Sequence, residues 1–172
     1  VWHDEYVVAD DGSVSFKTDA AGNDTRPGKY IAPAWQTYTF SDSTGYDVDA
    51  YEVVFEKGKH TISLEATRED LIIKTITLYP YENLPTYEDV LAEYAAAGYQ
   101  AATGAQPIIL QAEYAAATSA KTIYPQNDRT SAMTQPQSPT LSKLNTLGGT
   151  KWQGVGQWIE YTFTPEVSGL YE

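Results

Sequence analysis

Apolar and polar residues alternate along much of the chain with a period of two, which places one face of a β-strand against a core. The clearest alternating runs are residues 35–40, 50–55, 60–66, 71–79 and 158–163. Two shorter runs, 5–8 and 13–17, flank an acidic turn that ends in Gly12, and they predict a β-hairpin. Because short turns connect most of these runs, the pattern indicates antiparallel pairing.

One segment has helical spacing instead. Thr86 is a suitable N-cap, Glu88 and Asp89 occupy the first turn, and Gly98 is a natural stop, so we expect one short helix over residues 86–97. The small and polar residues that follow predict a linker. The chain therefore divides into a β segment (1–84), a helix with its linker (85–106) and a second β segment (107–172).

Composition excludes several functional classes. The 172 residues carry 23 acidic and 11 basic side chains, for a net charge of −12. This balance argues against nucleic acid, which is bound through clustered Lys and Arg, and against anionic membrane surfaces. No stretch approaches the roughly 20 apolar residues of a membrane span, so we expect no direct membrane insertion. Cysteine is absent, which excludes disulfides and a thiolate nucleophile.

The residues offer little support for catalysis. The only histidines are His3 and His60, and His60 fits a strand edge better than a catalytic base. No Gly-x-Ser-x-Gly elbow or phosphate-binding loop is present. A glycoside hydrolase needs two carboxyl groups about 5–10 Å apart, but among 23 acids chance pairs are inevitable. We therefore expect that the chain is not an enzyme.

The second β segment contains a familiar series of motifs. Residues 156–163 read Gly-Gln-Trp-Ile-Glu-Tyr-Thr-Phe, and Gly-Leu-Tyr follows at 169–171. With Leu-Gln-Ala-Glu at 110–113, this series resembles the opening half of carbohydrate-binding modules of families 6 and 35. The resemblance implies an all-β fold, an antiparallel β-sandwich of the galactose-binding-like, jelly-roll type.

The first β segment resembles the closing half of the same fold, because residues 58–64 read Gly-Lys-His-Thr-Ile-Ser-Leu before a further strand. The halves thus occur in permuted order. Either they form one composite sandwich, which we favour because each sheet must cover an apolar face, or they are the tail of one module and the head of the next. For a composite sandwich, the expected shared core consists of Ile62, Leu64, Ile73, Ile76, Ile109, Trp158, Tyr161 and Phe163.

Aromatic rings beside polar groups are typical of sugar sites, because rings stack on sugar C–H faces and planar polar groups bind hydroxyls. The predicted carbohydrate-binding residues are Trp152, Tyr124, Asn127, Asp128 and Trp35. Each loop aromatic can equally serve as a lid on the end of the sandwich. Near Trp35, the loop residues Asn23, Asp24 and Arg26 form either another polar cluster or a brace in which Arg26 pairs with Asp24.

Calcium is the expected cofactor, in a structural role. Glu113 matches a Glu that often holds structural calcium in the modules that the chain resembles, and Asp128 and the loop 19–24 supply further oxygen donors. The alternative is that Glu113 is an exposed strand carboxylate.

The resemblance implies a non-catalytic carbohydrate-binding accessory module of a secreted or cell-surface bacterial protein, with an oligosaccharide or polysaccharide as ligand. A looser similarity, to modules of large extracellular solute-binding proteins, suggests a role in sugar uptake. The strand-like end at residues 170–172 leads us to expect a longer parent chain whose neighbouring domains are partners. The alternative is a structural spacer or domain-interaction module that binds no sugar.

Overall fold

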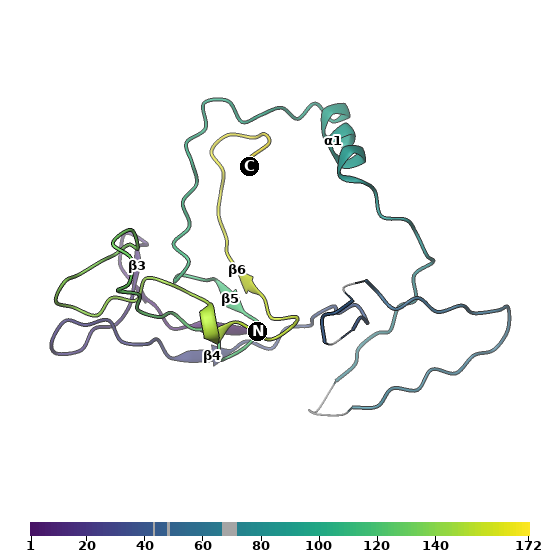
Figure 1. Cartoon of the computed structure of the whole chain (residues 1–172), viewed down its shortest axis with the longest axis horizontal. Helices are drawn as coiled ribbons and strands as arrows, with labels where there is room; N and C mark the ends of the chain where they lie inside the picture. The colour runs from purple at the N-terminus through teal and green to yellow at the C-terminus, as the bar shows by residue number, and fades with distance from the viewer. Residues whose placement is uncertain (43, 48, 67–71) are drawn as a thin grey trace.

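The computed structural model describes residues 1–42, 44–47, 49–66 and 72–172 (Figure 1). These residues form two antiparallel sheets. In the larger, β4 (Lys29–Ile31), β1 (Trp2–Asp4), β5 (Ala117–Thr118) and β6 (Ile159–Glu160) lie in that order. In the smaller, β2 (Val7–Val8) pairs with β3 (Val14–Ser15). The predicted hairpin and the antiparallel, β-rich character of the fold are confirmed.

The larger sheet brings together residues that are far apart in the sequence. On one side β1 pairs with β4, and on the other side Trp2 lies opposite Thr118 of β5. β5 pairs in turn with β6. Strands from residues 2–31 and from residues 117–160 therefore share one sheet.

A small core lies against these strands. Tyr6, Phe16 and Tyr114 form an aromatic cluster, in which Phe16 and Tyr114 stack with ring centroids 4.9 Å apart. The hydroxyl of Tyr6 donates to the carbonyl of Ala115 at 3.0 Å. Ile123 is fully buried. Rings from both β segments thus stabilise the same core.

Two ion pairs reinforce this unit. The ammonium of Lys29 lies 3.0 Å from the carboxylate of Asp4, with both side chains almost completely buried. Burial raises the pKa of Asp4, although Lys29 acts in the opposite direction. Lys143 lies 2.9 Å from Asp24, which also accepts a hydrogen bond from the backbone N–H of Leu144. Of the two alternatives for this loop, the Arg26–Asp24 brace is therefore not formed, and Asp24 pairs instead with Lys143 of the other β segment.

The helix α1 (Tyr87–Ala96) confirms the predicted helix. Thr86 is its N-cap, and its hydroxyl accepts from the N–H of Asp89 while the carboxylate of Asp89 accepts from the N–H of Thr86. Gly98 ends the helix with φ +82°, a left-handed conformation that favours glycine. A one-turn 3-10 helix, η1 (Gly149–Lys151), lies near the end of the chain. No described helix is long and apolar enough to span a bilayer.

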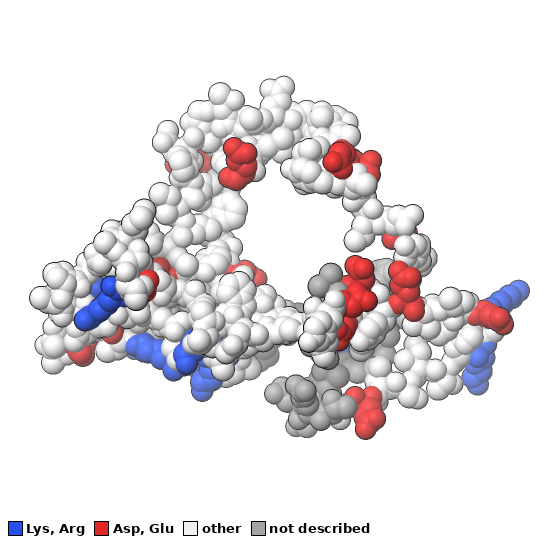
Figure 2. Space-filling view, viewed as in Figure 1, with Lys and Arg blue, Asp and Glu red and all other residues white. Residues whose placement is uncertain are grey.

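The middle of the chain does not pack into a compact unit but runs around a wide opening (Figures 1 and 2). Residues 52–66 and 72–85 run as extended chain without backbone–backbone hydrogen bonds among the described residues. Among the described residues, none of the predicted strands 35–40, 50–55 and 60–66 forms. The first two meet at one point, where the N–H of Tyr51 donates to the carbonyl of Phe40 at 2.8 Å. Leu71, which begins the next predicted run, lies outside the described residues. Ser41 and Ala50 form an isolated bridge.

Most of the expected shared core is consequently exposed. Ile62 is 48% exposed and Phe163 is 53% exposed, whereas Trp158 and Tyr161 are half-buried. The other exposed members of the expected core are Leu64, Ile73, Ile76 and Ile109. Alternation predicts strands with one apolar face, but residues 60–66 and 72–79 form no strand and leave that face exposed, because alternation does not identify the surface that would cover it.

Candidate ligand-binding site

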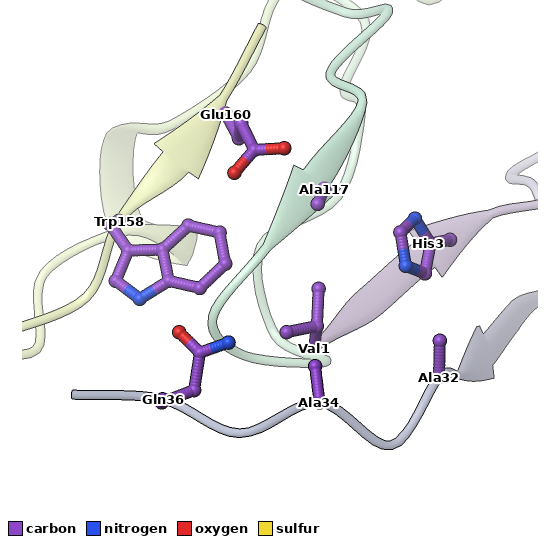
Figure 3. A pocket seen from close by; sticks show the side chains of 8 residues that line it. All are labelled: Val1, His3, Ala32, Ala34, Gln36, Ala117, Trp158 and Glu160. Atoms are coloured by element: carbon purple, nitrogen blue, oxygen red, sulfur yellow. The ribbon is translucent and has the colours of Figure 1, made fainter.

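A hollow of about 360 Å³ opens where β1, β5 and β6 meet the segment that follows β4 (Figure 3). Its walls combine an aromatic ring, three kinds of polar side chain and several small apolar side chains. The lining residues are Val1, His3, Ala32, Ala34, Gln36, Ala117, Trp158 and Glu160. This volume is at the lower end of the range for small-molecule sites.

Trp158 directly precedes β6, and it shares the hollow with Glu160 because residues two apart in extended chain face the same side. From the sequence, Trp158 is expected in the shared core of the sandwich rather than in a binding site. The backbone of Trp158 is held by a reciprocal pair of hydrogen bonds with Ser119. The N–H of Trp158 donates to the Ser119 hydroxyl at 2.9 Å, and the N–H of Ser119 donates to the Trp158 carbonyl at 3.0 Å. The indole is therefore carried on a fixed backbone.

His3 is held equally firmly on β1. Its Nδ1 lies 2.9 Å from the carbonyl oxygen of Ala116, and because a carbonyl can only accept, Nδ1 must donate. The ring also stacks on Tyr30, with centroids 5.2 Å apart. In the neutral ring this arrangement leaves Nε2 as a hydrogen-bond acceptor for a ligand.

Gln36 comes from the segment after β4, and in Figure 3 its amide points into the space beside Trp158. An amide both donates and accepts, and the carboxylate of Glu160 accepts from hydroxyl or ammonium groups. Within the described residues, the Glu160 carboxylate takes part in no ion pair. The hollow thus offers a ring face with complementary polar groups around it.

The predicted loop residues lie elsewhere, and the face of Tyr124 is already used. The guanidinium carbon of Arg26 lies 3.5 Å from the centroid of the Tyr124 ring, and the ammonium of Lys151 lies 5.5 Å from it. The guanidinium of Arg26 therefore occupies one face of the Tyr124 ring. Trp152 is 45% exposed, and its Nε1 donates to the carbonyl of Gln157 at 3.0 Å.

Asn127 and Asp128, the polar residues expected beside Tyr124 and Trp152, make hydrogen bonds within the loop that contains them. The amide of Asn127 donates to the carbonyl of Lys143. The carboxylate of Asp128 accepts from the N–H of Thr130 at 2.7 Å and from its hydroxyl, and these bonds lower the pKa of Asp128. Trp35 has the ammonium of Lys74 5.6 Å from its ring centroid. Its neighbours in the sequence line the hollow, but Trp35 itself does not.

Glu113, the predicted calcium ligand, is a buried carboxylate rather than an exposed one. It is 1% exposed, and its Oε1 has no hydrogen-bond partner among the described residues. Burial raises its pKa. The carboxylate of Asp19, by contrast, accepts from the N–H groups of Ala21 and Asn23 within its own turn. In the part of the chain that the structure describes, no three His, Cys, Asp or Glu side chains cluster as metal ligands.

No protein-family model matches the chain, and searches of curated proteins and of solved structures returned no significant match. Functional interpretation therefore depends on the geometry of the hollow. His3 and Gln36 are the contributors that sequence reasoning missed. The sequence placed Trp158 and Glu160 on one face of a predicted strand. Only the fold shows that His3 and Gln36 lie beside them.

Proposed function

We propose that the chain is a non-catalytic carbohydrate-binding accessory module of a secreted or cell-surface bacterial protein, with a role in sugar uptake. The observation that carries this proposal is the Trp158 hollow. The corresponding fold proposal is an antiparallel sandwich of the galactose-binding-like, jelly-roll type, in which the two β segments contribute halves in permuted order.

In the proposed complex, the apolar face of one sugar ring stacks on the indole of Trp158. Gln36 and the Nε2 of His3 bind hydroxyl groups, and the small side chains of Ala34 and Ala117 leave room for the ring. We propose binding without bond cleavage. Glu160 is the one carboxylate among the lining residues, whereas glycoside hydrolysis generally uses a pair.

The test is a titration of tryptophan fluorescence with plant and bacterial wall oligosaccharides. Replacing Trp158 with Ala should weaken binding of a neutral sugar by about 1–3 kcal/mol, the scale of losing one aromatic anchor. Trp152→Ala is the matched control, and this change should leave the affinity unchanged. If Trp152→Ala abolishes binding while Trp158→Ala does not, the site lies in the loops beside Tyr124. If no sugar binds at millimolar levels, the function is wrong.

We also propose that Glu113 holds a structural calcium ion. A buried carboxylate oxygen without a partner is a group that a cation would satisfy, and carboxylate oxygen is a ligand that calcium prefers. When bound, calcium would supply compensation for the buried negative charge. Glu113 would anchor the ion near β5, where its own carbonyl accepts a hydrogen bond from the hydroxyl of Tyr6.

A second function, a structural spacer or domain-interaction module, is favoured by one separate observation. The extended residues 52–66 and 72–85 expose apolar side chains and unpaired backbone, which is a template for pairing with another strand. The partners would be neighbouring domains of the parent chain. Full sugar affinity in the isolated chain would favour the binding module, and binding of a neighbouring domain without sugar affinity would favour the spacer.

A further inference from the structure

We infer that the Trp158 hollow selects a sugar unit that carries a free, positively charged amine. This inference rests on the proposed function and concerns the same site. An indole and a carboxylate, those of Trp158 and Glu160, both line the hollow, and no lining residue is Lys or Arg.

An indole face and a carboxylate are both partners for a cation. The ring quadrupole attracts an ammonium over its face, and a carboxylate forms a charge-assisted hydrogen bond with an ammonium. A neutral sugar has no cation to pair with the carboxylate of Glu160. An amine on the ring would use Trp158 for its C–H face and Glu160 for its charge.

The carboxylate of Glu160 is accessible to a ligand cation, because Glu160 is exposed and has no ion pair within the described chain. Asp4 pairs with Lys29, and Asp24 pairs with Lys143, but the carboxylate of Glu160 accepts no hydrogen bond and takes part in no ion pair there. A ligand amine would therefore not need to displace a resident cation. The net charge of −12 also raises the local concentration of cations and opposes binding of acidic sugars.

The rest of the hollow argues for a sugar amine rather than a bare ammonium ion. Gln36 and His3 supply hydrogen-bonding groups on other walls, and a simple alkylammonium has no hydroxyl groups to meet them. The hollow of about 360 Å³ also has room for more than the cation. We therefore assign an oligosaccharide of hexosamine units with free amines as the ligand class.

The test compares such a free-amine oligosaccharide with its N-acetylated counterpart by calorimetry at neutral pH, using the whole chain. The free-amine form should bind at least about tenfold more tightly at low salt. That preference should shrink as salt rises from about 0.02 M to about 0.3 M, because the Debye length falls. Binding of the N-acetylated form should hardly respond to salt.

Glu160→Gln should abolish the preference and retain binding of the N-acetylated form. Glu166→Gln is the matched control, since it removes one exposed charge outside the hollow, and it should keep the preference. The inference is overturned if wild-type protein binds both forms equally, if Glu160→Gln keeps the preference, or if tetramethylammonium binds as tightly as the amino sugar. If neither sugar form nor any neutral sugar binds, the proposed function fails as well.

Discussion

Asp4 and Glu113 are both buried carboxylates, but only Asp4 has a cation beside it. Asp4 faces the ammonium of Lys29 at 3.0 Å, so its charge is compensated inside the fold. Glu113 is equally buried, but no cation of the described chain pairs with it and its Oε1 has no partner. A buried charge without compensation is costly, which makes Glu113 the residue at which added calcium should act.

Calcium should therefore stabilise the chain through Glu113. At a calcium concentration of 100 times Kd, the free energy of unfolding should rise by about 2.7 kcal/mol, because the ion binds the folded state alone. Thermal unfolding followed by circular dichroism, with and without chelator, measures this. Glu113→Gln should remove the response, and Glu52→Gln, which changes an exposed carboxylate, should retain it. A response that persists in Glu113→Gln would place the ion elsewhere.

Residue pairs across the fold could not be predicted from the sequence. Arg26 precedes Pro27 in a loop that is rich in polar residues, and pairing with nearby Asp24 was the simplest local alternative. In the structure Arg26 stacks on Tyr124, and Asp24 pairs with Lys143. Both partners are about a hundred positions away in the sequence, so no local pattern could identify them.

Among the elements, the helix was predictable because its signals are local. The N-cap Thr86, the first-turn acids and Gly98 all act within a few residues of the element that they bound. The strands are different. β5 consists of Ala117 and Thr118 in an Ala-rich stretch, and its partner strands decide its pairing. Conversely, residues 60–66 have clear alternation but no strand partner among the described residues.

The N-terminus of α1 should depend on pH. Hydrogen bonds from the hydroxyl and backbone N–H of Thr86 lower the pKa of Asp89, so the folded cap favours the ionised form. Its contribution is present above the ordinary value of 3.8 and is lost as pH falls through the lowered pKa. Carbon chemical shifts of residues 87–96 should therefore lose helical character in acid.

Asp89→Ala should reduce those helical shifts at neutral pH, and Thr86→Ala should destabilise the helix by about 1 kcal/mol. Glu88→Gln is the control, because Glu88 lies in the same first turn outside the capping box. Equal loss of helix in Glu88→Gln and Asp89→Ala would show that first-turn charge matters rather than the cap.

The whole molecule has far more surface than a compact protein of its mass. Its accessible area is 14305 Å², whereas a compact chain of 19.0 kDa exposes about 8,400 Å². The excess is visible as the wide opening in Figure 2, ringed by extended segments and the helix. The β-rich, antiparallel character followed from alternation, but this openness did not, because alternation carries no information about long-range contacts.

The two β segments should depend on each other for folding. Expressed separately, residues 1–84 lack β5 and residues 105–172 lack β1, so each should show poorly dispersed amide spectra. Mixing them should restore dispersion, since the β1–β5 pairing and the aromatic cluster join them. If both pieces fold alone as stable monomers, the shared core is not required. Lys143→Ala in the second piece should weaken the reassembly, because it removes the pair with Asp24.

The sheet order β4-β1-β5-β6 also has a consequence for protease treatment. A cut within residues 72–85 would break the covalent chain but would leave every strand pairing of this sheet intact. The nicked protein should therefore migrate as one particle under native conditions and as two bands after denaturation. Because residues 72–85 contribute no strand to the sheet, this stretch is also a suitable place for the new termini of a circularly permuted chain.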